Sequence, residues 1–199
     1  MKKSLLVLLI SFSVGAVFSC SKAADEQKRL LSGTAVKGDQ GYTYKITLEK
    51  IQFNWRIDNN NLRIKLFAQT PGWVGIGFNP SEGMKDADFI LGSAAGGTAT
   101  ISNQHGVSKT LHSKNTDIGG VNRVINPSGS ETKNGTEISF TIPYKTDDKL
   151  TKPISVTEDI PVLLAYGQSK HLMQLHSFRA KLTVNLSTGK YAVILMTEK

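Results

Sequence analysis

Cysteine is the scarcest chemically informative residue in this sequence, because the 199 residues contain only one, Cys20. A single thiol cannot form an internal disulfide, a thiolate zinc site or an iron–sulfur cluster. The sequence also has no Cys-x-x-Cys-His motif, which excludes covalent attachment of haem. Any haem must therefore be held without covalent bonds.

Short motifs of hydrolases and metalloenzymes are also missing. We find no Gly-x-Ser-x-Gly, no His-x-His, no carboxylate cluster and no His-Glu-x-x-His spacing. The segment 92–97 is rich in glycine but lacks the lysine of a phosphate-binding loop. The sequence therefore has none of these short motifs of a hydrolase or of a metalloenzyme.

Basic residues exceed acidic ones, and the formal net charge is +8. No basic run is interleaved with aromatic residues after the first residues of the chain, so we expect no nucleic-acid partner. A modest positive excess instead favours acidic partners or anionic surfaces.

The first residues have the pattern of an export signal. Lys2 and Lys3 precede an apolar stretch over 5–18 that is too short to span a bilayer comfortably. The segment Val17-Phe18-Ser19-Cys20 resembles a lipobox, in which the cysteine is lipidated and becomes the mature N-terminus. We therefore expect a signal peptide over 1–19 and an exported lipoprotein, anchored to a membrane through Cys20 and facing the periplasm or the cell surface. The alternative is ordinary cleavage after Ala23, which would release a soluble protein.

The remaining chain divides into a polar segment and one domain. Residues 20–40 comprise the lipidated cysteine and a polar, charged stretch without periodicity, as expected of a flexible tether. Residues 41–199 have a length that suits one domain. Apolar residues there recur with a period of two, most clearly over 42–48, 62–68 and 138–142.

Many short strands with frequent turn residues predict an all-β domain. Further strands are expected over 73–78, 88–93, 120–125, 162–166, 181–186 and 191–196. The last two flank Ser187-Thr188-Gly189-Lys190, which has the composition of a hairpin turn. We predict an antiparallel, immunoglobulin-like β-sandwich. A closed β-barrel is the alternative.

His176 is the first candidate ligand. If residues 174–186 are extended, His176 shares a face with Phe178 and Ala180, and its side chain points inward. An inward imidazole must satisfy both ring nitrogens, and binding a metal through one of them is an economical solution. A core-edge histidine bonded to a backbone carbonyl explains the same pattern.

Met84 is the second candidate ligand. It follows Asn79-Pro80-Ser81-Glu82-Gly83, a turn-rich connection between two expected strands. A thioether in a polar loop could cover a pocket or act as a soft ligand to iron. An ordinary loop methionine is the alternative.

Three stretches carry a family resemblance. Trp73-Val74-Gly75-Ile76-Gly77-Phe78-Asn79 is followed by Met84-Lys85-Asp86-Ala87-Asp88-Phe89-Ile90-Leu91-Gly92, and 175–186 forms a late segment. Together they resemble the DOMON domain family, whose members are β-sandwiches that bind haem b or sugars.

The resemblance implies a noncovalent haem b. In haem-binding members, residues at the positions of Met84 and His176 are the axial ligands. It also implies an electron-transfer protein and not an enzyme, because Met/His iron has no open position. Electrons would pass to and from a separate redox partner protein. Trp73, Phe78 and Phe89 are expected as apolar walls of the haem pocket.

Other ligands and another function stay open. His171 and Met173 lie close enough to His176 to compete with it, whereas His105 and His112 lie in polar segments and are expected to be solvated. The alternative function is a sugar- or small-ligand-binding module without haem, built from Trp55, Trp73, Asn79, Asp86 and Asp88.

Overall fold

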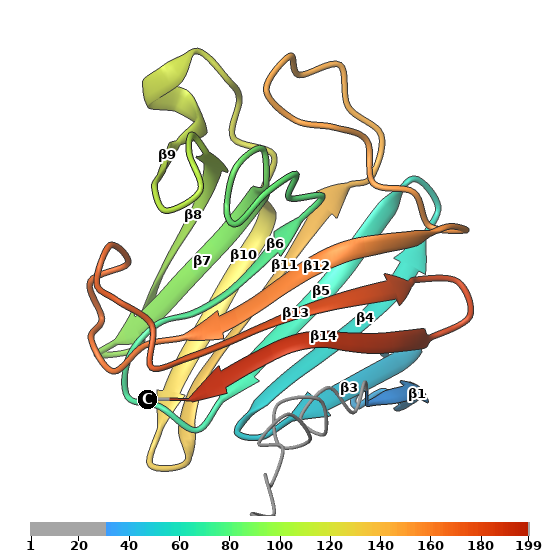
Figure 1. Cartoon of the computed structure of the whole chain (residues 1–199). Helices are drawn as coiled ribbons and strands as arrows, with labels where there is room; N and C mark the ends of the chain where they lie inside the picture. Colours follow the sequence, from blue (N-terminus) through green and yellow to red (C-terminus); the bar gives the residue numbers. More distant parts are fainter. Residues whose placement is uncertain (1–30, 199) are drawn as a thin grey trace, which may run out of the picture.

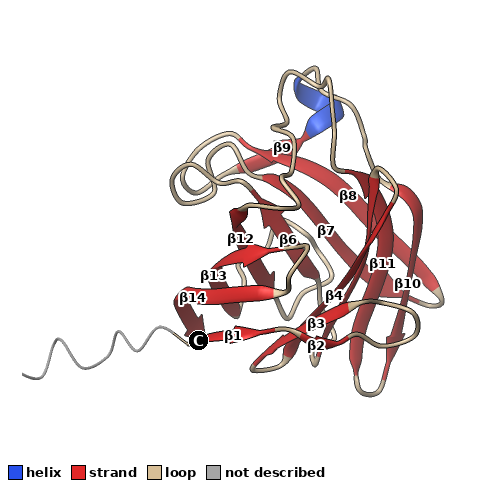
Figure 2. Cartoon of the chain, turned by 90° about the vertical axis from the view of Figure 1, so that its right-hand side faces the viewer, coloured by secondary structure: helices blue, strands red, loops and turns tan. Residues whose placement is uncertain are grey.

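Two antiparallel sheets packed face to face make up the fold (Figures 1 and 2). The computed structural model describes residues 31–198. The eight-stranded sheet has the order β1 (Ser32–Thr34), β14 (Lys190–Glu198), β13 (Phe178–Asn185), β12 (Asp159–Tyr166), β6 (Val74–Phe78), β7 (Asp88–Ala95), β8 (Thr98–Gly106) and β9 (His112–Lys114). The six-stranded sheet has the order β10 (Ile125–Thr132), β11 (Gly135–Pro143), β5 (Asn61–Ala68), β4 (Ile51–Asp58), β3 (Tyr44–Leu48) and β2 (Val36–Lys37). A short 3-10 helix, η1 (Asn115–Ile118), follows β9.

Alternating apolar residues form the core between the sheets. On β5 and β11, Leu66 pairs with Ile138 and Ile64 with Phe140, and all four side chains are buried. Since successive side chains of a strand point to opposite faces, the residues between them face away from the core. The all-β, two-sheet class is confirmed, and the immunoglobulin-like arrangement within it stays a prediction.

β6 shows the same alternation in an unusual form. Val74, Ile76 and Phe78 are buried against the six-stranded sheet, while the outward positions are Gly75 and Gly77. A Cβ atom at Gly75 would overlap the Leu91 side chain, and one at Gly77 would press on the Phe89 ring. The two glycines therefore let side chains of β7 lie flat on the outer face of the sheet.

The strand predictions were right at most places and wrong at a few. Residues 120–124 are not a strand, and β10 begins only at Ile125. Residues 174–177 are likewise outside a strand, because β13 begins at Phe178. The prediction missed β4, β8 and β9.

The N-terminal boundary also differs from expectation. β1 pairs with β14 and β2 pairs with β3, so residues expected in the tether add strands to both sheets. Cys20 and the expected signal peptide lie outside the described residues. Within residues 31–198, no helix has the length and apolar character needed to cross a membrane.

Candidate functional site

An apolar cavity of about 340 Å³ lies on the outer face of the eight-stranded sheet. Its floor is formed by outward-facing residues of three neighbouring strands, among them Gly75 on β6, Leu91 on β7, and Leu163 and Ala165 on β12. Leu91 belongs to a second apolar cluster that is separate from the core between the sheets, and Leu163 and Ala165 pack against that cluster. Pockets of this size with an apolar floor are typical of small-molecule and cofactor sites.

Met84 and His176 both line this cavity, although they are far apart in the sequence. Met84 lies in the loop that follows the C-terminal end of β6. His176 precedes β13, whose first residue, Phe178, pairs with Tyr166, which in turn pairs with Val74 at the other end of β6. The two residues therefore line the cavity from opposite ends of the same short strand.

The backbone holds Met84 in place from two sides. Its N–H donates to the Lys109 carbonyl at 3.0 Å, and its carbonyl accepts from the Ala87 N–H at 3.2 Å. Gly106 lies directly against that carbonyl, and a Cβ atom at Gly106 would overlap it. The thioether side chain is half-buried against the second apolar cluster.

The prediction that His176 points inward from a strand was wrong, although His176 does line the cavity. His176 does not share the inward face of β13, because it precedes the strand, and Phe178 points into the core. The cavity is on the opposite face of the sheet, the face of Arg179 and Lys181. His176 is half-buried there because the segment 167–177 folds back over the sheet.

Trp73 fixes that segment. Its indole Nε1 donates to the Gln174 carbonyl at 3.2 Å, and its backbone N–H donates to the Ser169 carbonyl at 3.0 Å. The Gly167 N–H donates in turn to the Trp73 carbonyl, and Gly167 packs so closely on the indole that a Cβ atom would overlap it. Trp73 is thus both a wall of the cavity and the support of the segment that carries His176.

Of the other expected walls, one is present and one is elsewhere. Phe89 lines the cavity. Phe78 is fully buried in the core between the sheets, because its parity on β6 is that of Val74 and Ile76. The Phe78 side chain points away from the cavity, so Phe78 supports the fold and not the site.

His112 is a residue of the cavity that the sequence did not predict. It lines the cavity, packs on Phe89 with ring centroids 5.6 Å apart, and has its Nδ1 hydrogen-bonded to the Gln104 side-chain oxygen. Burial lowers the pKa of His112. The polar neighbours of His112 in the sequence suggested a solvated residue, and only the pairing of Gly106 with His112 brings it inward.

The remaining candidate ligands separate clearly. His171 is exposed and is not among the residues that line the cavity, whereas Met173 lines it with about half of its surface exposed. Leu175 lines the same rim and is 66% exposed.

Cationic side chains also lie at the rim. Lys109, Arg179 and Lys181 all line the cavity. Lys109 forms an ion pair with Glu82, and the Arg179 Nε donates to the Thr197 hydroxyl at 3.2 Å. Among residues 31–198, Arg179 and Lys181 have no carboxylate partner.

A buried polar cluster lies behind Phe89. Asp88 and Arg123 form an ion pair with both side chains 3% exposed, and the Asn103 side-chain N–H donates to Asp88 at 2.7 Å. Burial raises the pKa of Asp88, while the Arg123 guanidinium and the Asn103 amide oppose that rise. The cluster joins the start of β7 to the chain that follows η1.

The residues proposed for a sugar site do not come together. Trp55 is fully buried and donates from Nε1 to the Leu186 carbonyl, and Asp88 is engaged by Arg123. The Asn79 amide donates to the Pro153 carbonyl at 3.1 Å. Of this set, only Trp73 lines the apolar cavity.

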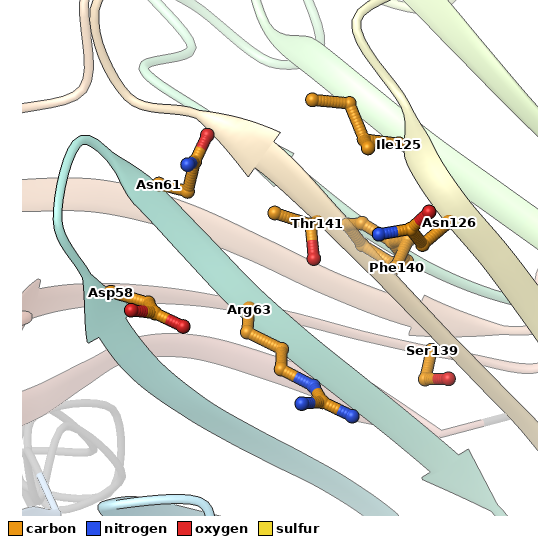
Figure 3. A pocket seen from close by; sticks show the side chains of 8 residues that line it. All are labelled: Asp58, Asn61, Arg63, Ile125, Asn126, Ser139, Phe140 and Thr141. Carbon is orange, nitrogen blue, oxygen red and sulfur yellow. The ribbon is translucent and has the colours of Figure 1, made fainter.

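A second cavity, of about 360 Å³, lies on the outer face of the six-stranded sheet (Figure 3). It is mostly polar, and its lining includes Asp58, Arg63, Asn126, Ser139 and Thr141. It contains neither a histidine nor a methionine. Within residues 31–198, no group of three or more His, Cys, Asp or Glu side chains could hold a metal ion.

Comparison with known proteins agrees with this architecture. The model of the DOMON domain family matches residues 47–167. The cytochrome b domain of pyranose dehydrogenase from Coprinopsis cinerea superposes with a TM-score of 0.57 and 14% sequence identity, over 75% of this chain and 84% of that domain.

A human protein also matches part of the chain. DBH-like monooxygenase protein 1 from Homo sapiens is 33% identical over 72 residues, which is 34% of this chain. That match spans only 12% of the human protein's length.

Proposed function

We propose that this chain, which belongs to the DOMON domain family, is a haem b-binding electron-transfer module with Met84 and His176 as axial ligands. The observation that carries the proposal is that a thioether and an imidazole enter one apolar cavity from opposite ends of β6. Both are ligands that haem iron accepts in cytochromes. The similarity to a cytochrome b domain supports the same reading at the level of the fold.

The rest of the cavity fits the group as well. Gly75, Leu163 and Ala165 present a flat apolar floor, and Trp73 and Phe89 add aromatic walls. Arg179 and Lys181 give the rim a positive charge, which would attract an anionic group from solution. The backbone contacts of Met84 and the Trp73 hydrogen bond hold both ligand segments before any cofactor binds, which reduces the ordering cost of binding.

Electron transfer is the chemistry that this ligand pair supplies. Haem iron bound by both Met84 and His176 would have no open position for oxygen or substrate, so we infer a carrier and not an enzyme. The protein's own contribution is to exclude water from the apolar floor and to fix the ligands, because burial and the hydrogen bonds around the ligands tune the potential. The partner would be a separate redox protein.

We also infer that the chain is exported and lipid-anchored at Cys20. This part of the proposal relies on the sequence of residues 1–20 and on the strands that begin at Ser32. Incorporation of labelled palmitate into the full chain, and its loss in Cys20→Ser, tests it. Palmitate labelling that persists in Cys20→Ser would contradict it.

Reconstitution of the purified chain with haem b tests the main proposal. We expect stoichiometric binding, a sharp Soret band and low-spin α and β bands on reduction. His176→Ala should lose most of the haem or its low-spin spectrum, whereas His171→Ala should retain both, because His171 lies outside the cavity. Absence of haem binding by the wild-type chain would refute the function, and the reverse behaviour of the two histidine variants would refute the ligand assignment.

A further inference from the structure

We propose that His112 is a reserve ligand, able to occupy the Met84 coordination position when the thioether is absent. This inference rests on the proposed haem function and concerns a residue that the family resemblance does not assign. The cavity would then hold three possible iron ligands, with His176 at one end and Met84 and His112 as alternatives at the other.

His112 and Met84 lie at the same end of the cavity. Gly106, the last residue of β8, pairs with His112 on β9 and also lies against the Met84 carbonyl. The N–H of Met84 is bonded to Lys109, in the tight connection that leads into β9. His176 comes from the opposite end of β6, so His112 can replace Met84 without competing for the place of His176.

The hydrogen bonds of His112 prepare one nitrogen for a ligand. Gln104 is buried, and its side-chain N–H donates to the Ser102 hydroxyl at 3.1 Å, which leaves the Gln104 oxygen to face His112. That oxygen can only accept, so His112 Nδ1 carries the hydrogen and Nε2 keeps its lone pair. An imidazole whose Nδ1–H is held by an oxygen is the usual arrangement of a metal-binding histidine.

Packing limits how far the ring must move. The imidazole lies against Phe89, with an interplanar angle of 47°, and both rings are walls of the cavity. Its β9 backbone is paired with β8, so the side chain is presented by a strand and not by a free loop. The cost of ordering this ligand is therefore already met by the fold.

The test compares Met84→Ala with Met84→Ala/His112→Ala, each reconstituted with haem. We expect the single variant to stay low-spin, with the electron paramagnetic resonance signal of two imidazoles in the oxidised state. The double variant should become high-spin. The oxidised wild type should show the Met/His signal and not the signal of two imidazoles.

Two further variants make the result decisive. Met84→Ala/His171→Ala should resemble Met84→Ala, because His171 is outside the cavity. If loss of the imidazole prevents folding, as judged by circular dichroism, Met84→Ala/His112→Phe keeps an aromatic ring against Phe89 and should also be high-spin.

Each contrary outcome has its own meaning. A high-spin Met84→Ala protein that matches the double variant would overturn the reserve-ligand proposal and leave the haem function intact. A wild type that shows the signal of two imidazoles would also overturn it, because a second imidazole would then bind even with Met84 present. Failure of the wild-type chain to bind haem would instead refute the proposed function from which this inference starts.

Discussion

Asp88 and Arg123 form an ion pair that is almost completely removed from water, with 3% of each side chain exposed. Removal of one partner from such a pair leaves an uncompensated buried charge, which typically costs about 3–5 kcal/mol. We therefore expect Arg123→Met to lower the free energy of unfolding by about that amount, measured by urea denaturation near neutral pH. Arg56→Met is the matched control, because its partner Asp58 is exposed and such pairs contribute about 0–1 kcal/mol.

The same pair gives a pH dependence. Burial raises the pKa of Asp88 in the folded state above its unfolded value, so the folded state binds the proton more tightly. Stability from this group therefore increases as the pH falls through the folded pKa, and is lost as the pH rises through it. Arg123→Met removes the cation that opposes this rise in pKa. The loss in free energy of unfolding relative to wild type should therefore shrink on acidification more for Arg123→Met than for Arg56→Met. A deficit that stays constant with pH would show that Asp88 is not the cause.

At the scale of elements, the segment 167–177 is held in place by Trp73, the residue directly before β6. Trp73→Phe keeps an aromatic wall but removes the donor to the Gln174 carbonyl. A hydrogen bond of this kind contributes about 1 kcal/mol, so we expect haem to bind about fivefold more weakly, with little change in the apo fold. Haem titration of Trp73→Phe measures this change in affinity. Trp55→Phe is the control, because the Trp55 indole lies in the core and not in the cavity. Equal affinity of wild type and Trp73→Phe would contradict the supporting role.

The strands themselves were largely predictable, and the exceptions have physical causes. Period-two alternation identified β5 and β11, because one of their faces is buried and the other is not. β4 has the same period, because apolar and polar residues alternate strictly over Ile51–Asp58, so the sequence indicated this strand as well although it was not predicted. His176 was assigned to the wrong face because a run of alternating residues was extended past the true start of β13.

The site was predictable only where a motif carried it. Met84 and His176 were identified by resemblance, and both line the cavity. His112 was not identifiable, since it enters the site through the pairing of β8 with β9, and such pairing is a tertiary feature. Phe78 was wrongly placed in the cavity wall. The outward positions of β6 are glycines, so the sequence Val-Gly-Ile-Gly-Phe does not show which face of the strand each residue takes.

At the scale of the whole molecule, the charge around the cavity predicts the kind of partner. Arg179 and Lys181 at the rim have no carboxylate partner within residues 31–198, and exposed Met173 and Leu175 lie beside them. An acidic protein with an apolar centre fits this face. We expect the reduced holoprotein to be oxidised faster by hexacyanoferrate(III) than its driving force alone predicts, with a rate that falls as salt is added. A cationic cobalt complex should show the opposite salt dependence.

Variants with equal net charge distinguish this face from the rest. Arg179→Glu/Lys181→Glu should slow the anionic oxidant roughly tenfold at low salt, because local charge steers encounter. Lys37→Glu/Arg63→Glu makes the same change in net charge on the six-stranded sheet and should have a much smaller effect. Similar rates for both pairs, measured by stopped flow, would rule out a docking face at the cavity.

The glycines of β6 allow the cavity and the fold to vary independently. The inward residues of this strand keep the two sheets together, and the outward positions only leave space. A small side chain at Gly75 would push Leu91 into the cavity while Val74 and Ile76 stayed packed. A single substitution of this kind would remove the space for a cofactor while the protein still folds. The fold of a relative therefore says little about whether it binds a cofactor. The outward residues of β6 say more.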